Sequence, residues 1–411
     1  MIRVAIIMGK MHAGGKKNLV MEYYRHIDRN KIQFDFLCDA DSNSVPKDEI
    51  EALGGRVYII PPYQNILANM SEMKRIFIEN KYLVVHGYNS TMNLFAMLVG
   101  KQCGIPIRIN ESISMGHKKD SKNLFKSILR PFSSCFATHY MSNGEECGRW
   151  QFGNKLFDAG MVTVFKTVID TEKHKYEPEL REKCRKEYGL EDNVVIGHIG
   201  RFTAQKNTLF IIDIFNEIAK REQRAKLLLI GHGELERQMM DRVKRYGLED
   251  KVLNLGKRED IHQFYNAMDC FLLPSLYEGL PIVGVEAECC GLPMFFSTEI
   301  PKESSPCDDL GIFISLDRSA KDWAIVVLDK IRILLEKRKD HSFQVSRAGF
   351  DSISEGSRLS EYYIDIVSSL ADVRERGGVL HEKTLVTYNQ SNVITLNMCY
   401  ASFNFIERME A

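Results

Sequence analysis

The chain has 411 residues, of which 44% are hydrophobic and 27% charged, an ordinary composition for a globular protein. This length is more than one hydrophobic core normally organises, so we expect two domains. The 55 basic and 55 acidic residues cancel, which excludes the overall positive field typical of nucleic-acid-binding proteins.

The ten cysteines are scattered without a C-x-x-C pair. This spacing argues against a zinc site and a disulfide framework, and it favours a reducing cytoplasm. The first apolar run, residues 4–8, is too short for a signal peptide, and no segment approaches 18 apolar residues. We therefore expect a cytoplasmic protein without a membrane span.

Short apolar runs predict parallel strands at residues 3–8, 34–38, 83–86 and 105–109 of the first half. The first strand is followed by a loop that ends in Gly14 and Gly15, and then by a helical stretch at residues 17–28. Strand, glycine loop and helix form a phosphate-binding arrangement, although this loop fits neither Walker A nor G-x-G-x-x-G. From the residues alone, a tight turn and a diphosphate contact are equally good interpretations.

Asp39 and Asp41 follow the second strand as a D-x-D pair. Such a pair can hold a divalent metal on a sugar nucleotide, so it is the rival catalytic site. Aspartate and serine after a strand are also ordinary turn residues. We expect a structural turn here and no metal.

A basic segment follows the fourth strand and carries apolar residues at helical spacing. Its charges are Lys118, Lys119, Lys122, Lys126 and Arg130 against a single acidic residue, Asp120. The pattern suits a helix lying on an anionic membrane surface, and it equally suits a helix that packs on the core with a solvated back.

The second half repeats the strand, loop and helix pattern, with predicted strands at residues 194–199, 227–230, 252–255 and 270–273. Arg201 and Lys206 lie in the first of these loops, before a predicted helix at residues 209–220. Two cations beside free helix N–H groups can form a combined site for a diphosphate, although two solvated loop charges would give the same pattern. Glycines follow the second strand, and Lys257 and Arg258 follow the third.

The stretch 273–293, LPSLYEGLPIVGVEAECCGLP, organises this half. A strand stops before Pro274, a turn forms at Glu278 and Gly279, and Pro281 is expected at the first helical position. The helix should end near Cys290 because glycine and proline follow. Glu278 and Glu286 therefore bracket the turn, where they can bind several hydroxyls, although a polar loop Glu and a solvated helix Glu would give the same spacing.

The segment E-G-L-P-I-V-G-V-E-A closely resembles the E-x7-E element of glycosyltransferase family 4, and G-R-F-x-x-Q-K-N resembles its donor-phosphate element. The resemblance covers residues 1–370. It implies an α/β GT-B fold, with two Rossmann-like doubly wound domains facing across a cleft. The implied parts are an acceptor domain at 1–166, a nucleotide-sugar domain at 172–355 and a crossover helix at 356–371, while residues 372–411 stay unassigned.

The resemblance also implies the site. Arg201 and Lys206 would stabilise the leaving diphosphate, Glu278 would hold sugar hydroxyls and Glu286 ribose hydroxyls, without metal or cofactor. The implied donor contacts are Gly14, Gly15, Arg201, Lys206, Gly231, Gly233, Lys257, Arg258, Glu278, Gly279, Leu280, Pro281 and Glu286.

The sequence departs from the family in the loop 110–117, where family members usually present a histidine to the acceptor. Glu111 or Ile113 stands at that position, and His117 is the nearby imidazole. His117 is the candidate catalytic histidine and Glu111 the alternative.

The expected reaction is transfer of a hexose or N-acetylhexosamine, with retention, from a nucleotide-diphosphate sugar such as a UDP-sugar. The expected acceptor is a hydroxyl of a glycan or lipid-linked acceptor in surface polysaccharide biosynthesis. If the basic segment binds lipid, the enzyme would work on the inner face of the plasma membrane. A sugar-nucleotide epimerase and a non-catalytic glycan-binding partner are the alternatives.

Overall fold

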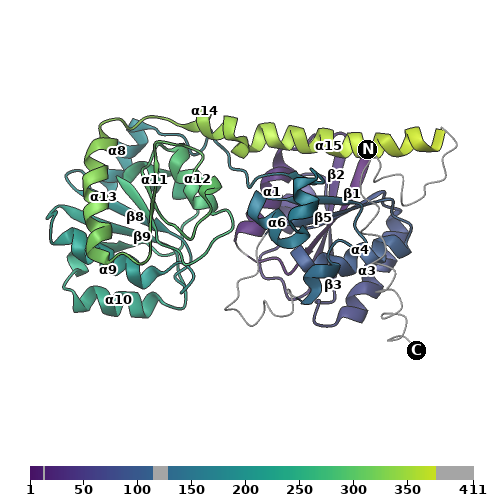
Figure 1. Cartoon of the computed structure of the whole chain (residues 1–411), viewed down its shortest axis with the longest axis horizontal. Coiled ribbons are helices and arrows are strands. Elements are labelled where there is room, and N and C mark those ends of the chain that lie inside the picture. Colours follow the sequence, from purple (N-terminus) through teal and green to yellow (C-terminus); the bar gives the residue numbers. More distant parts are fainter. Residues whose placement is uncertain (13, 114–127, 376–411) are drawn as a thin grey trace. The chain divides into compact units, whose positions relative to one another are not determined.

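The computed structural model of the chain describes residues 1–12, 14–113 and 128–375 (Figure 1). The chain forms two compact units. The first contains residues 1–166 together with the helix residues from Gly356, and the second contains Thr167–Glu355. The membrane segment proposed at 118–130 lies mostly outside the described residues, as do His117 and the chain after residue 375.

The first unit is built on a seven-stranded parallel sheet in the order β3-β2-β1-β4-β5-β6-β7. The strands are β1 (Ile2–Gly9), β2 (Ile32–Asp39), β3 (Arg56–Ile60), β4 (Val84–Gly87), β5 (Ile107–Ser112), β6 (His139–Ser142) and β7 (Val162–Val164). The four strands predicted between residues 3 and 109 are confirmed with shifts of one to three residues at their ends. The edge strand β3 was not predicted.

Helices cover both faces of this sheet, as a doubly wound fold requires (Figure 1). They are α1 (Gly15–His26), α2 (Lys47–Ala52), α3 (Ile66–Asn80), α4 (Asn93–Gln102), α6 (Glu145–Phe152) and α7 (Asn154–Asp158). On one face, the side chains of Ile7 and Val85 join a core with Ile76 and Phe77 of α3 and Met97 of α4.

The second unit has a six-stranded parallel sheet in the order β10-β9-β8-β11-β12-β13. The strands are β8 (Val194–Ile199), β9 (Ala225–Ile230), β10 (Val252–Asn254), β11 (Cys270–Leu273), β12 (Met294–Ser297) and β13 (Gly311–Ile314). Leu227 and Leu229 of β9 enter one core cluster, and Leu228 and Ile230 enter another. Alternate residues thus face opposite sides, which explains the continuous apolar runs in the sequence.

Helices cover both sides of this second sheet as well. They are α8 (Pro178–Glu187), α9 (Thr208–Ala219), α10 (Glu236–Arg245), α11 (Ile261–Ala267), α12 (Ile282–Cys289), α13 (Ala320–Leu335) and α14 (Ser342–Val345). Helix α9 packs with α10 and α13, and α11 packs with α8 and α12. The strand order reverses between β8 and β11, so the carboxyl ends of these two strands form the crevice where an open α/β sheet binds its ligand.

The last described helix, α15 (Ser352–Glu375), returns the chain to the first unit. The hydroxyl of Tyr363, which is fully buried, lies 2.6 Å from Nδ1 of His86 in β4. The backbone N–H of Asp28 donates to Ser360 Oγ at 2.9 Å. These contacts hold the helix against the first sheet. Within the described residues, no helix combines the length and the apolar character that crossing a membrane requires.

Candidate functional site

Two loops meet at the switch point of the second sheet, one after β8 (residues 200–207) and one after β11 (residues 274–281). The backbone N–H of Leu276 donates to the carbonyl of Gln205 at 2.8 Å, and Gln205 Nε2 donates to the carbonyl of Tyr277 at 3.2 Å. The loops that carry the G-R-F-x-x-Q-K-N and E-x7-E elements are therefore joined directly.

Lys206 and Glu278 form an ion pair across this junction. Lys206 Nζ lies 2.6 Å from Glu278 Oε1, and the two side chains are only 14% and 8% exposed. Gln205 Nε2 approaches the other carboxylate oxygen at 3.4 Å. The structure brings these two predicted residues together, and in this state each neutralises the other.

Arg201 lies at the start of the same loop and has an exposed side chain. Among the residues that the structure describes, no carboxylate lies within ion-pair distance of its guanidinium. Arg201 is therefore a cation that an anionic ligand can approach at once, whereas Lys206 must first leave Glu278.

Glu286 is held inside α12 by groups from two other segments. The hydroxyl of Tyr265 donates to Oε2 at 2.6 Å, and Nε2 of His174 lies 3.6 Å from Oε1. Burial, with the nearby carboxylate of Glu286, raises the pKa of Tyr265 well above its usual range, so its phenol stays a donor. The carboxylate is fixed in orientation, and Tyr265 and His174 are functional candidates that the sequence analysis missed.

The start of α12 differs from the prediction in one respect. Pro281 is the N-cap, with φ −72° and ψ 108°, and the helix begins at Ile282. No side chain caps this end, so the first N–H groups of the helix stay available for an anion. The neighbouring Gly279 and Leu280 are partly exposed, and the helix ends before Cys290 as predicted.

Gly231 and Gly233 have a packing role that the sequence did not reveal. A Cβ atom on Gly231 would lie 1.8 Å from the carbonyl oxygen of Gly200, and one on Gly233 would lie 2.3 Å from that of Phe202. The N–H of Phe202 donates to the carbonyl of His232 at 3.0 Å. These glycines let the loop after β9 support the Arg201 loop, so any larger residue would displace it.

Lys257 and Arg258 follow β10, which lies two strands away from β8 in the sheet. Arg258 pairs with Asp260 through Nε to Oδ1 at 2.9 Å and Nη2 to Oδ2 at 2.6 Å, and its guanidinium lies over the ring of Phe264. Lys257 is exposed. Of these two cations, Lys257 is thus the more accessible to a ligand.

In the first unit, Gly14 caps α1 with φ 144°, a backbone conformation that favours glycine, and Gly15 is the first helical residue. Two lysines in the first turn of α1 bind protein groups. Lys16 Nζ donates to the carbonyl of Met8, and Lys17 Nζ donates to Ser44 Oγ at 3.0 Å. The loop is thus fastened to the first sheet and to the loop after β2.

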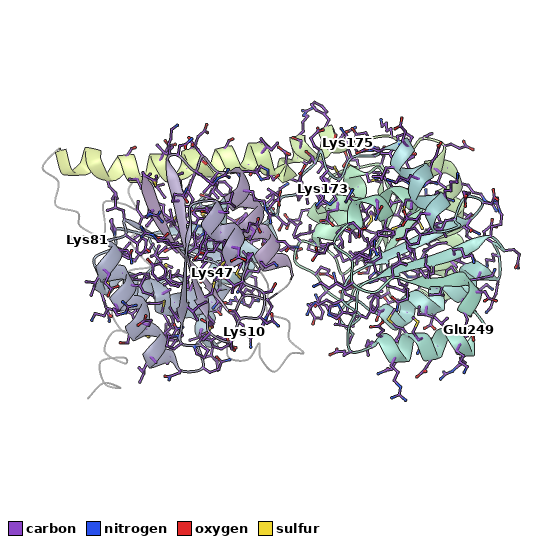
Figure 2. The ribbon with its side chains drawn as sticks, turned by 180° about the vertical axis from the view of Figure 1, so that it is seen from behind. Lys10, Lys47, Lys81, Lys173, Lys175 and Glu249 are labelled. Carbon is purple, nitrogen blue, oxygen red and sulfur yellow. The ribbon has the colours of Figure 1, made fainter. Side chains whose placement is uncertain are left out.

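The two aspartates of the D-x-D pair are engaged separately. Asp39 is buried and accepts from the N–H of Tyr63 at 3.3 Å, and burial raises the pKa of its carboxyl. Asp41 pairs with Lys10 at 2.7 Å (Lys10 is labelled in Figure 2). Within the described ranges, no group of three His, Cys, Asp or Glu side chains is arranged to hold a metal ion. Each carboxylate of the pair thus has its own protein partner.

Glu111 has a partner within the first unit. Its side chain is buried at the end of β5, where Oε2 lies 2.9 Å from Nε2 of His86, itself fully buried. The alternative that placed Glu111 beside the acceptor stays a prediction. His117 lies outside the described residues.

In the comparison with known proteins, the family match lies within the second unit. Residues 181–304 match the sequence model of the family described as glycosyl transferases group 1. This match covers the whole junction of the two loops and both carboxylates.

Relatives resemble the chain along most of its length. EpsF of Bacillus subtilis (strain 168), named as a glycosyltransferase, is 29% identical over 88% of this chain and 96% of its own. UDP-Gal:alpha-D-GlcNAc-diphosphoundecaprenol alpha-1,3-galactosyltransferase of Escherichia coli is 22% identical over 89% of this chain and 97% of its own.

Among solved structures, Anabaena HepE in complex with UDP-glucose superposes with a TM-score of 0.69 at 18% identity, covering 90% of this chain and all of HepE. Together with the two parallel-sheet units, this likeness confirms the predicted GT-B fold.

Proposed function

We propose that the chain is a retaining glycosyltransferase that moves a hexose or N-acetylhexosamine from a nucleotide-diphosphate sugar to an acceptor hydroxyl. The observation that carries this proposal is the junction of the β8 and β11 loops. It places two cations, an uncapped helix start and two oriented carboxylates at one switch point. A diphosphate bearing a sugar and a ribose has the complementary groups.

The roles follow from charge and position. The leaving group is a diphosphate, so the barrier falls when its growing negative charge is stabilised. Arg201, Lys206 and the first N–H groups of α12 supply this stabilisation. Glu286, fixed by Tyr265, is suited to ribose hydroxyls, and Glu278 to sugar hydroxyls. Neither carboxylate is assigned as a nucleophile, because a group that holds hydroxyls is not behind the anomeric carbon.

The remaining contacts of the donor form the edges of this site. Gly231 and Gly233 shape the loop that supports Arg201, and Lys257 and Arg258 would lie on the side of the base. In the first unit, Gly14 and Gly15 at the start of α1 stay a predicted phosphate contact. We expect no metal or cofactor, since Arg201 and Lys206 would supply the positive charge that the diphosphate needs.

A UDP-sugar is the donor that the comparisons support, because HepE is described in complex with UDP-glucose and the Escherichia coli relative is named for UDP-Gal. That relative's name also describes an acceptor linked to diphosphoundecaprenol. We therefore propose a glycan or lipid-linked acceptor, with polysaccharide biosynthesis in the cytoplasm as the setting. The basic residues 118–130 would bring the enzyme to the inner face of the membrane.

The test is incubation of the purified chain with several nucleotide sugars while release of nucleoside diphosphate is followed. The proposal expects slow release with one sugar, accelerated by the matching acceptor, and an α-linked product by NMR from an α-linked donor. An epimerase would change the sugar without an acceptor. A non-catalytic partner would release nothing, and either outcome would contradict the proposal.

A further inference from the structure

His198, in β8, is a buried histidine whose ring orientation is fixed. Its Nδ1 lies 2.9 Å from the carbonyl oxygen of Leu272, and the side chain is fully buried. A carbonyl only accepts, so Nδ1 carries the hydrogen. Burial lowers the pKa of His198 to about 4, so the ring is neutral in ordinary buffers. Nε2 therefore presents a lone pair.

That lone pair has no donor among the residues that the structure describes. A buried acceptor without a partner destabilises the fold. The hydroxyl oxygens of Thr203 and Ser275 in the same two loops, and of Thr208 at the start of α9, are also buried without a partner in the described part of the chain. Unpartnered polar atoms thus gather at the switch point, where a polar ligand or a rearranged side chain can satisfy them.

Lys206 lies near this lone pair, on the side of Gly200. A Cβ atom on Gly200 would lie 3.4 Å from His198 Nε2 and 3.7 Å from Lys206 Cε. The ammonium group of Lys206 is one bond beyond Cε, and at present it lies against Glu278. A phosphate oxygen would be repelled by the lone pair, whereas an ammonium group with three donors can bind it.

We propose that His198 positions Lys206 for catalysis by accepting a hydrogen bond from its ammonium group when the donor sugar occupies Glu278. This inference rests on the proposed function of the site. Glu278 cancels the charge of Lys206 in the ion pair, whereas a neutral imidazole holds the ammonium without cancelling its charge. The exchange of partners leaves Glu278 free for sugar hydroxyls and turns the full charge of Lys206 towards the diphosphate.

The experiment first finds the UDP-sugar that the parent protein turns over fastest, then measures kcat and KM for two variants. His198→Leu removes the acceptor, and we expect kcat to fall about tenfold, the effect of one hydrogen bond to a charged group, with KM changed less than kcat. His198→Gln offers a side-chain carbonyl and should recover much of that loss. His139→Leu is the control, since burial also lowers the pKa of His139 in the first unit to about 4.

A spectroscopic measurement separates positioning from support of the fold. In the parent labelled with 15N-histidine, the Nε2 resonance of His198 should move when the UDP-sugar is added, as a lone pair gains a donor. Parental kcat in His198→Leu, or an unmoved Nε2 resonance in an active parent, would overturn this inference and leave the proposed function standing. A parent that releases no nucleoside diphosphate from any nucleotide sugar would overturn both.

Discussion

The ion pair between Lys206 and Glu278 makes the most specific prediction about stability. Lys206→Met leaves the carboxylate of Glu278, which is 8% exposed, without its cation. Because a buried charge that loses its partner destabilises a fold by 3–5 kcal/mol, we expect a loss of about 3 kcal/mol, near the lower end for a pair that is partly exposed.

The reverse change should cost less. Glu278→Gln leaves an ammonium group on a flexible stem that can turn to solvent, so we expect a loss of about 1 kcal/mol. The double variant has no unpaired charge, and it should lose about 2 kcal/mol less than the two single variants together. The expected signature is a large coupling energy with unequal single effects.

Urea unfolding followed by tryptophan fluorescence can measure this coupling energy in the second unit alone. The chain has two tryptophans, and Trp150→Phe removes the one in the first unit. Trp323, in α13 of the second unit, is fully buried and then reports on its own unit. If the single effects add to within about 0.5 kcal/mol, the two side chains do not interact and the geometry derived above is wrong.

Four further predictions concern catalysis, metals, pH and membranes. Arg201→Ala should lower kcat about a hundredfold, or about 3 kcal/mol, because its charge acts on the bond-breaking state, whereas Glu286→Gln should raise the donor KM and leave kcat nearly unchanged. Turnover should survive EDTA, and Asp39→Asn should keep its activity. As the pH falls from about 6.5, the pKa of histidine in an unfolded chain, towards 4, the second unit should lose stability, because the folded state resists protonation of His198. His198→Leu should flatten this dependence. Replacing the four lysines within residues 118–126 by glutamine should weaken binding to anionic liposomes, by about 1 kcal/mol for each lysine near the surface.

Each of these predictions has a measurement that can contradict it. Steady-state kinetics on single variants that fold test the prediction about catalysis. A parental kcat/KM in Arg201→Ala would show that Arg201 does not act on the bond-breaking state. Loss of turnover in EDTA, restored by manganese, would favour the D-x-D pair as the catalytic site. If the acid unfolding curve of His198→Leu equals that of the parent, His198 does not cause the pH dependence. If the parent does not bind anionic liposomes, the membrane proposal is wrong.

Local signals predicted most of the strands and the two loops that follow β8 and β11, whereas the GT-B fold was implied by the family resemblance. Buried parallel strands read as continuous apolar runs, so β8 and β11 were predicted at their observed ends. The edge strand β3 was not predicted, although its residues 57–60 form a short apolar run, VYII; only Ile60 of its five residues is buried. Motif spacing likewise placed Lys206 and Glu278 in neighbouring loops, but it could not show their ion pair.

Partners that meet only through the tertiary structure were beyond the sequence. Tyr265 approaches Glu286 from α11, and nothing in its surroundings marks it as different from a core tyrosine. His198 looked like part of an apolar strand. Glu111 was considered for the acceptor because of its position in a loop, yet the sheet extends to Ser112 and turns its carboxylate towards His86. Such contacts depend on sheet order, which no single segment encodes.

The central claim is that the junction of the β8 and β11 loops binds the diphosphate of a nucleotide sugar, and a crystal structure with a bound UDP-sugar tests it most directly. The account predicts the diphosphate beside Arg201 and the first turn of α12, ribose hydroxyls on Glu286, and Lys206 moved away from Glu278. A nucleotide bound elsewhere in the second unit, with the Lys206–Glu278 pair still at 2.6 Å, would contradict it.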